Sequence, residues 1–309
     1  YAGFFKFRNA WFSLYQKHAV DGDTIYVAAG TYNEEVKVNT VNDLKSITIL
    51  GANAETVPES NIADGTVLTG GMYLGTDSSA EINKAVTVKG ITFSGGKGLL
   101  LGNIQTVTVE NNKFLHIDRT FNPSTTDIAA IAVIDPYAGG NTTINNNYID
   151  GVQGVEEGET GQGLGIYIRK PTNVSISANH VEGTAHNTIL LAGTVTDATV
   201  SITGNKVVNW DSDNDDTVGG RALRSAVAAS KFIFTNNCMV KGEWADNPVD
   251  PNFVKVTNLP STAKVDIDGN YWNSDKPDFS SILADSSSNV TVANYYSDEA
   301  MEDLVTLNE

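Results

Sequence analysis

Asparagine recurs in this chain at one fixed position of an apolar pattern, and no other feature of the sequence restricts the fold as strongly. The pattern reads apolar, any, apolar, any, any, Asn, any, apolar. Six segments follow it, with Asn112, Asn147, Asn179, Asn205, Asn237 and Asn270 in the asparagine position. Period-two alternation on both sides of a two-residue bend predicts two strands joined by a tight corner. A strand-corner-strand unit that repeats along the chain predicts a solenoid.

The intervals between these positions predict where the chain departs from the bare repeat. Three earlier segments keep the spacing with Ala52, Met72 and Ile91 in the asparagine position, and these positions and Asn112 lie 20, 19 and 21 residues apart. The later asparagines follow at intervals of 35, 32, 26, 32 and 33 residues. The surplus predicts five loops at one corner of successive coils, at 115–127, 150–163, 182–187, 208–224 and 240–252. Loops inserted at the same corner of every coil would stack into one wall.

The pattern favours an all-β solenoid, a parallel β-helix of about nine or ten coils, because short strands without a helical half do not suit helical repeats. One domain is expected over residues 1–309, with coils over 21–297 and caps at 1–20 and 298–309. The six asparagines are expected to point inward and to bond to one another, because a buried amide without a partner costs a few kcal/mol.

Both ends of such a rod expose strand edges that need a cover. The first segment has apolar or aromatic residues at helical spacing, which predicts an N-terminal capping helix. These residues are Phe4, Phe7, Trp11, Leu14 and His18. After Ser297 and Asp298, which suit the start of a helix, a second short apolar stretch predicts a C-terminal cap.

Two segments connect this chain to a known family. Residues 21–32 read DGDTIYVAAGTY, and ITILG follows at 47–51. They resemble the first coils of pectin-lyase-like right-handed parallel β-helix proteins, and Asn270-Tyr271-Trp272 is similar to a corner in late coils of bacterial surface β-helices. The resemblance covers nearly the whole chain and implies a right-handed parallel β-helix. It implies no single activity, because the fold carries lyases, hydrolases, esterases, tailspikes and adhesins.

Composition excludes several classes of partner. The net charge is −17 and there is no basic stripe, so nucleic acid and anionic membranes are poor partners. No apolar stretch suits a membrane span, no signal peptide is present, and the single Cys238 excludes an intrachain disulfide. The chain begins at Tyr1 rather than Met, and strands rich in Thr and Ser are typical of secreted rods. We expect a bacterial secreted or cell-surface protein, either a monomer or part of a longer surface protein.

The densest acidic cluster is WDSDNDD at 210–216. Its alternating carboxylates Asp211, Asp213 and Asp215 suit Ca²⁺, which takes six to eight oxygen ligands in irregular geometry. The EF-hand pattern then fails, because Asp216 replaces its glycine and Ala222 stands where its bidentate glutamate belongs. A calcium site and a solvated acidic turn both remain open.

Catalytic candidates come from the ends of successive strands, because the motif strings of pectate lyases, polygalacturonases and pectin methylesterases do not occur. Asp135 and Arg169 end equivalent strands and are expected about one coil spacing apart, with His186 and Arg224 near the next two strands. Arginine beside carboxylates could abstract a proton next to a uronate carboxyl, and paired aspartates could hydrolyse a glycoside. A structural Asp135–Arg169 ion pair is the other reading.

The loops direct the functional hypothesis toward sugars. They hold 14 of the 37 acidic residues, 4 of the 20 Lys and Arg, and two tryptophans, Trp210 and Trp244. Aromatic faces cover the apolar faces of sugars, carboxylates accept bonds from hydroxyls, and loops on a rigid scaffold often carry function. We expect a carbohydrate-binding or adhesion module whose glycan contacts Trp210, Trp244, Arg169 and Asp135. A polysaccharide lyase or glycoside hydrolase on the same wall, and a structural spacer, are the alternatives. Few loop cations favour a neutral glycan, unless Ca²⁺ bridges an acidic one.

Overall fold

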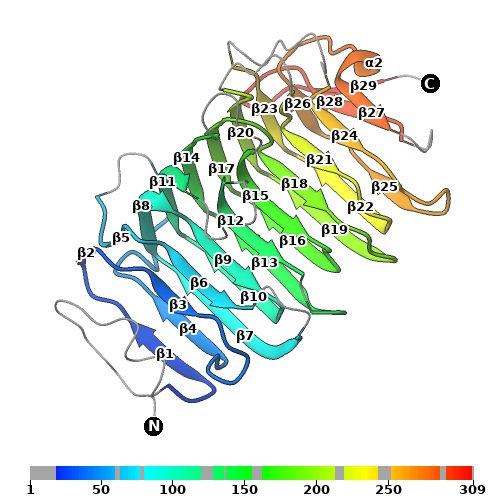
Figure 1. The fold of residues 1–309 in the computed structure, drawn as a ribbon. Helices are drawn as coiled ribbons and strands as arrows, with labels where there is room; N and C mark the ends of the chain where they lie inside the picture. Colours follow the sequence, from blue (N-terminus) through cyan, green and yellow to red (C-terminus); the bar gives the residue numbers. More distant parts are fainter. Residues whose placement is uncertain are drawn as a thin grey trace.

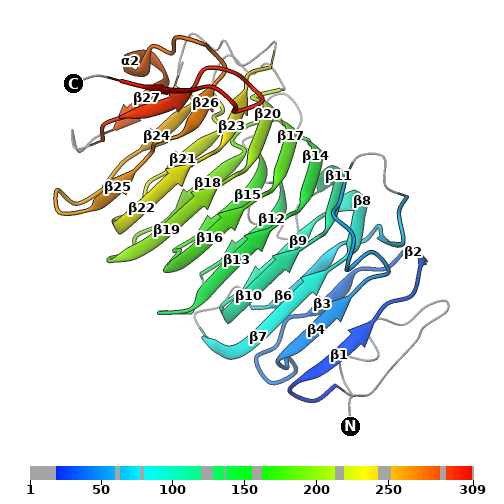
Figure 2. The same ribbon diagram turned by 180° about the vertical axis from the view of Figure 1, so that it is seen from behind.

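The structure, a computed structural model, describes residues 19–59, 63–76, 80–119, 128–135, 137–154, 162–212, 219–242, 252–285 and 290–307. Strands stack above one another into a rod, with the two ends of the chain at opposite ends of it (Figures 1 and 2). The long sides of the rod are three sheets of parallel strands, so the expected all-β parallel β-helix is confirmed. No helix in these ranges is long and apolar enough to cross a membrane.

Each coil contributes one strand to each of three sheets. Sheet A is made of β1 (Asp23–Tyr26), β4 (Ile47–Leu50), β7 (Ile82–Lys89), β10 (Ile104–Glu110), β13 (Asn141–Asn145), β16 (Asn173–Ser177), β19 (Ala198–Thr203), β22 (Ala229–Thr235) and β25 (Lys264–Asp266). Sheet B is made of β2 (Gly30–Tyr32), β5 (Thr66–Leu68), β8 (Ile91–Lys97), β11 (Lys113–Arg119), β14 (Tyr148–Val152), β17 (His180–Thr184), β20 (Lys206–Trp210), β23 (Cys238–Val240), β26 (Asn270–Trp272), β28 (Asn294–Tyr296) and β29 (Leu304–Thr306). Sheet C is made of β3 (Val36–Val38), β6 (Met72–Gly75), β9 (Leu99–Gly102), β12 (Ile128–Ile134), β15 (Gly163–Arg169), β18 (Ile189–Ala192), β21 (Leu223–Ser225), β24 (Val254–Val256) and β27 (Leu283–Asp285). One short helix, α2 (Phe279–Ile282), precedes β27.

Nine coils, each running from sheet A through sheet B to sheet C, are complete in the described ranges. One predicted corner is wrong. Met72 begins β6 of sheet C, and it does not occupy the corner between sheets A and B. The alternation around Met72 fits any strand-corner-strand unit, so the pattern could not tell one corner of the coil from another. Without Met72 the predicted corners number eight, and the ninth coil is the first in the chain, which begins with β1 and β2. In the second coil, Ile47 of β4 pairs with Val86 of β7, so that coil takes 39 residues and not 20.

The asparagine ladder is confirmed. Asn112, Asn147, Asn179, Asn205, Asn237 and Asn270 are all buried where sheet A turns into sheet B. Each Nδ2 donates to Oδ1 of the next asparagine along the rod, at 3.1, 2.9, 2.9, 2.9 and 3.0 Å in order. Each Oδ1 from Asn147 onward also accepts the backbone N–H of the asparagine before it. The ladder therefore satisfies both side-chain and backbone groups in the core.

The residue before each ladder asparagine makes the corner. It has a left-handed backbone, with φ of 54° at Asn111, 54° at Asn146, 53° at Ala178, 66° at Gly204, 57° at Asn236 and 64° at Gly269. Glycine and asparagine adopt this conformation at low cost, which explains their frequency at this position, and Ala178 is the exception. The sharp turn lets the alternation resume on sheet B with apolar side chains again facing the core.

An outward column on sheet B is covered near both ends. It contains Lys113, Tyr148, His180, Lys206, Cys238 and Tyr271 in register. Lys113 Nζ lies 3.2 Å from Asp64 in the long loop of the second coil. At the other end Cys238 Sγ donates to the carbonyl oxygen of Glu299 at 3.6 Å, and burial raises the pKa of this thiol to about 11. The thiol is therefore uncharged at neutral pH and shielded by the C-terminal segment.

The C-terminal cap is a β-hairpin, and the expected helix start is wrong. β29 runs antiparallel to β28, which itself adds to sheet B beside β26. The Asp298 carboxylate does accept backbone N–H groups, but from Glu302 and Asp303 at 3.0 Å each, and it closes the hairpin turn. Leu304 and Thr306 are exposed and Val305 between them is half-buried, so this segment has the period of a strand and not that of a helix. Residues 4–18 lie outside the described ranges, so the N-terminal helix stays a prediction.

Candidate functional site

The five predicted loops all belong to one corner of the rod. Each connects a strand of sheet B with the next strand of sheet C, from β11–β12 to β23–β24. Their predicted boundaries are too early, because β11 continues to Arg119, β14 to Val152 and β20 to Trp210. The loop centres at 120–127, 155–161, 213–218 and 243–251 lie outside the described residues. The described site is therefore the outer face of sheet C beside this corner.

One outward column follows the centre of sheet C from coil to coil. In register it contains Lys37, Tyr73, Leu100, Ala132, Tyr167, Leu190, Arg224 and Lys255. Neighbours in the column are about 4.8 Å apart, because that is the spacing of paired strands. Its first part is aromatic and aliphatic and its last part is cationic. The change of character takes place within one step, from Leu190 to Arg224.

The apolar part of the column is a second cluster, separate from the core inside the rod. Tyr73, Leu100 and Ala132 pack with Ile134, and Tyr167 packs against them while staying half-buried. Lys37 Nζ lies 5.5 Å above the centre of the Tyr73 ring, within the range of a cation–π contact. Tyr73, Leu100, Ala132 and Ile134 are only 7 to 8% exposed, so Tyr167 is the ring of this cluster that a ligand could contact.

The cationic part places like charges on neighbouring strands. Arg224 of β21 and Lys255 of β24 are directly paired in register, and like charges in such a pair repel. Burial, and then the nearby guanidinium groups of Arg221 and Arg224, hold the pKa of Lys255 below its usual 10.5. Burial and Arg224 lower the pKa of Arg221 to about 10, although Asp211 opposes this shift. Arg224 and Lys255 are half-buried on the outer face of sheet C, and guanidinium and ammonium groups so placed can bind an anionic group.

Asp135 and Arg169 are neighbours, as predicted. Arg169 donates through Nε to Asp135 Oδ1 at 3.0 Å and through Nη2 to Oδ2 at 2.6 Å, and Lys170 Nζ lies 3.3 Å from Oδ1. Asp135 has a left-handed backbone with φ of 44° where the chain leaves β12. A bidentate pair of this geometry at a turn is an ion pair that fixes the corner, and it leaves Arg169 with little freedom to reach a ligand.

His186 is inside the corner rather than on the outer face. It is 4% exposed, just before β18, and its Nδ1 is in hydrogen-bond contact with Asn187 Nδ2. Asn187, fully buried, also donates to Oε1 of Gln162 one coil earlier at 3.2 Å. These contacts place His186 in a buried polar cluster that links two coils. The structure does not bring it together with Asp135 and Arg169, which lie at the opposite ends of the sheet C strands.

The expectation that Trp210 offers a sugar-binding ring is wrong. Trp210 is 1% exposed and packs edge-on against Phe253, with ring centres 4.9 Å apart, as part of the core. The cause is one left-handed residue in β20, Asn209 with φ of 52°, which shifts the alternation by one and turns Trp210 inward. The other predicted platform, Trp244, lies outside the described residues.

The predicted calcium ligands are described only in part. Asp211 is 2% exposed, and its Oδ1 accepts the backbone N–H of Gly220 at 2.6 Å, so this carboxylate holds together the two ends of the loop between β20 and β21. Asp213 and Asp215 lie in the range left out between 213 and 218. Within the described ranges no three His, Cys, Asp or Glu residues are grouped as a metal site. The calcium site stays a prediction.

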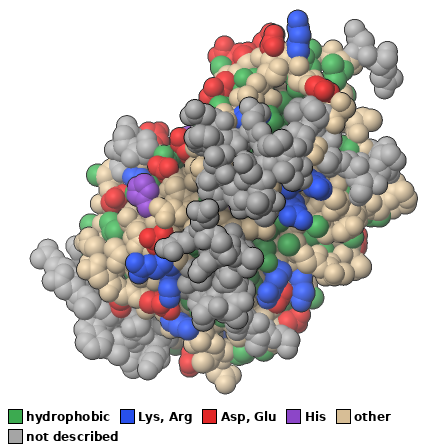
Figure 3. All heavy atoms as spheres, turned by 45° about the horizontal axis from the view of Figure 1, so that its top comes forward, with side chains coloured by type: hydrophobic (Ala, Val, Ile, Leu, Met, Phe, Trp, Pro, Cys, Tyr) green, Lys and Arg blue, Asp and Glu red, His purple; other side chains and the backbone are tan. Residues whose placement is uncertain are grey.

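Four residues of the sheet C face, Tyr73, Tyr167, Arg221 and Lys255, were not among the predicted site residues. Most of the predicted site residues lie in loops or near strand ends, whereas these four belong to the middle of strands or lie just before one. The sequence did contain an indication of the cations, because Arg224 and Lys255 each stand between two apolar or small residues that face inward in a three-residue strand. Such a residue must face outward. On the surface seen in Figure 3, Lys and Arg side chains lie in several separate groups.

Comparisons with known proteins found no match for this chain. No protein-family model matches the chain, and neither a curated protein nor a solved structure matches it. The likeness to pectin-lyase-like proteins therefore stays a resemblance of sequence segments, and the fold is established by the strand pairing alone.

Proposed function

We propose that this protein is a secreted or cell-surface β-helix that binds an acidic glycan along the outer face of sheet C. The observation that carries the proposal is one outward column of sheet C in which the half-buried ring of Tyr167 is followed, after Leu190, by the cations Arg224 and Lys255. From Tyr167 to Lys255 this column crosses four strands, a length of about 14 Å. A linear polymer suits such a site better than a small molecule does.

The chemistry of the column supports a sugar with acidic groups. The half-buried ring of Tyr167 can cover the CH face of a sugar ring, and guanidinium and ammonium groups bind carboxylates or sulfates. The loops alone favoured a neutral glycan because they hold few cations. The strands supply the cations that the loops lack, and for this reason an acidic glycan fits better.

The test is retention of the protein in affinity gels that contain a uronate polymer, a sulfated polysaccharide or a neutral glucan. Retention by an acidic polymer is expected, and the double change Arg224→Gln and Lys255→Gln should weaken it by about tenfold or more, because hydrogen bonds to charged groups contribute about 1.5–3 kcal/mol each. Lys231→Gln is the matched control, since it removes a cation from sheet A of the same coil as Lys255. Equal retention of both variants, or retention by the neutral glucan alone, would refute the acidic-glycan site.

A lyase acting on the same glycan is the second candidate, because Arg224 and Lys255 are paired on neighbouring strands. One cation could bind a uronate carboxyl while the other acts as the base that removes the proton next to it. Release of unsaturated ends from the retained polymer would assign this activity. Retention without new ends after long incubation would leave binding as the function.

A further inference from the structure

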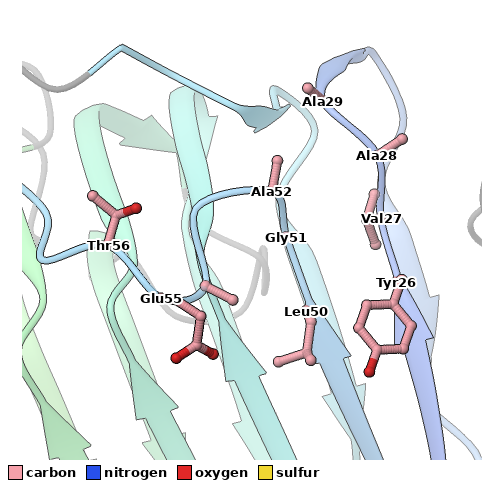
Figure 4. A pocket seen from close by; sticks show the side chains of 10 residues that line it. Tyr26, Val27, Ala28, Ala29, Leu50, Gly51, Ala52, Glu55 and Thr56 are labelled. Carbon is pink, nitrogen blue, oxygen red and sulfur yellow. The ribbon is translucent and has the colours of Figure 1, made fainter.

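An apolar groove of about 660 Å³ lies on the outside of the first two coils, where sheet A turns toward sheet B. Tyr26 and Leu50, which are neighbours in register on β1 and β4, stand side by side in it, and Ala28 and Ala52 lie beyond them (Figure 4). Glu55 stands at the rim with its side chain 88% exposed, and its Oε1 lies 3.6 Å from Lys89 Nζ, which leaves the carboxylate open to a second cation. The groove is within the size range of ligand sites and far from the cationic part of sheet C.

Exposed apolar side chains in the described ranges gather at the ends of the rod. Those of the first two coils are Val20 (60%), Tyr26 (40%), Val41 (39%) and Val57 (55%), and those of the other end are Leu304 (51%) and Leu307 (38%). The middle coils, where described, keep their large apolar side chains covered. Grouped apolar exposure of this kind marks a contact surface.

The chain itself contains a segment that complements this groove. Residues 1–18 contain Trp11 and four of the 11 phenylalanines of the chain. They also contain Lys6, Arg8 and Lys17 but no acidic residue, in a protein with 37 acids and a net charge of −17. An aromatic and basic segment matches both the apolar wall of the groove and the carboxylate at its rim.

We propose that the N-terminal segment binds in this groove, with Phe4 and Phe7 against Tyr26 and Leu50, and with a basic side chain beside Glu55. The segment would then close the flank of the first two coils, which goes beyond a cap on the open end of the rod. The proposal does not depend on glycan binding.

The segment is long enough to reach the groove from its point of attachment. Ala19 packs against the core near Val38 and Ile47, at the corner where β1 begins, and the groove lies at the far end of β1. β1 has four residues and is about 13 Å long. Residues 4–18 in the helix that their spacing predicts would extend about 22 Å. The phenylalanines near the start of the segment can therefore pass the whole of β1.

A disulfide trap tests the contact directly. The variant Phe7→Cys with Ala52→Cys should form an intramolecular disulfide under mild oxidation, because the only native cysteine, Cys238, is buried. Phe7→Cys with Ser175→Cys is the control, since Ser175 faces outward in the middle of sheet A. Equal oxidation of the two variants would overturn the proposal. A disulfide that joins two copies of the protein would mean that the segment of another molecule occupies the groove, and this result would overturn the proposal as well.

Trypsin cleavage after Arg8 provides a second measurement in the full chain. Leu50→Arg places a positive charge in the groove and should release the basic segment, so that cleavage after Arg8 becomes about tenfold faster than in the native protein. Thr143→Arg adds the same residue to the middle of sheet A and should leave the rate unchanged. If Arg8 is cut at one rate in all three proteins, the segment does not bind in the groove.

Discussion

The outer faces of sheet A and sheet C belong to the same nine coils but differ in how they use them. On sheet A, one outward column holds seven consecutive hydroxyl side chains, Thr24, Thr48, Thr87, Thr108, Thr143, Ser175 and Ser201. On sheet C, the corresponding column changes from aromatic to aliphatic to cationic along the rod. The repeat is regular on the outer face of sheet A, and on the outer face of sheet C it is broken by the aromatic and cationic residues of the proposed glycan site.

In a solenoid, a position where the repeat is broken at a cost in stability is a good candidate for a functional residue. Thr and Ser on sheet A satisfy the demands of a solvated strand, because β-branched and small polar side chains fit a pleated surface and need no partner. Arg224 beside Lys255 departs from this rule, because two like charges are paired in register on neighbouring strands and repel each other. A costly departure from the repeat is better evidence for a site than a dense cluster of acidic loop residues.

The largest effect is expected inside the scaffold that both faces share. Asn179→Leu should lower the free energy of unfolding by about 3 kcal/mol or more, because it leaves buried groups without partners. The groups that lose a bond are Asn147 N, Ile144 O and Asn205 Oδ1. Denaturant unfolding measures the change. A loss below about 1 kcal/mol would mean that the ladder is not what aligns the coils.

The pH dependence of glycan binding tests the cationic part of sheet C. Because the pKa of Lys255 is depressed below 10.5, its charge is complete at neutral pH and is lost as the pH rises through the lowered value. Binding of an acidic polymer should therefore weaken at a pH where an ordinary lysine is still charged. Lys255→Arg should preserve binding to higher pH. If the affinity of the native protein for the polymer stays constant up to pH 10.5, Lys255 does not contribute to binding.

Two arginines of sheet C are expected to respond in opposite ways. Arg169→Gln should cost about 1 kcal/mol of stability, because it breaks a partly exposed bidentate pair with Asp135. Arg224→Gln should leave stability unchanged or raise it slightly, because it relieves repulsion by Lys255 and Arg221. Thermal unfolding of both variants measures the difference. If both variants lose the same stability, Arg224 stabilises the fold as Arg169 does, and the proposed difference between the outer faces of sheet A and sheet C becomes weaker.

Calcium offers a smaller test of the same corner. If Asp211, Asp213 and Asp215 bind Ca²⁺, a free concentration about five times Kd should stabilise the fold by about 1 kcal/mol. The melting temperature with calcium should then exceed that with a chelator, and Asp213→Asn should remove part of the difference. Identical melting curves would leave this loop a solvated turn.

The smallest effect is expected on sheet A. Thr143→Ala and Ser201→Ala should change stability by less than about 0.5 kcal/mol and glycan retention not at all, because both side chains face solvent on a regular surface. The corresponding change on sheet C, Tyr167→Ala, should reduce retention of the glycan. If the sheet A variants reduce it equally, the ligand does not distinguish the two faces.

The sequence predicted the scaffold much better than the site. Asn112 to Asn270 were recognised because the ladder demands one residue type at one position, and the register of five coils follows from it. Trp210 was misplaced because the left-handed Asn209 shifts the alternation by one, as His116, Gly151 and Gly183 do at the equivalent positions of earlier coils, and the apolar pattern alone does not show which residue is left-handed. Met72 was misplaced because all corners share the same period. Lys255 was missed because it stands 31 residues from Arg224 in the chain, and only strand pairing makes them neighbours.

The asparagine ladder also sets how the rod would behave under tension. Every side-chain bond in it joins residues 26 to 35 positions apart, so each bond closes one turn of the chain. A force applied to the C-terminal end along the axis would break one such bond together with the strand pairs of one coil, and then meet the next. Each event would free roughly 90–120 Å of chain, at about 3.4 Å per residue. The rod would lengthen in discrete steps, and the coils not yet reached would keep their shape.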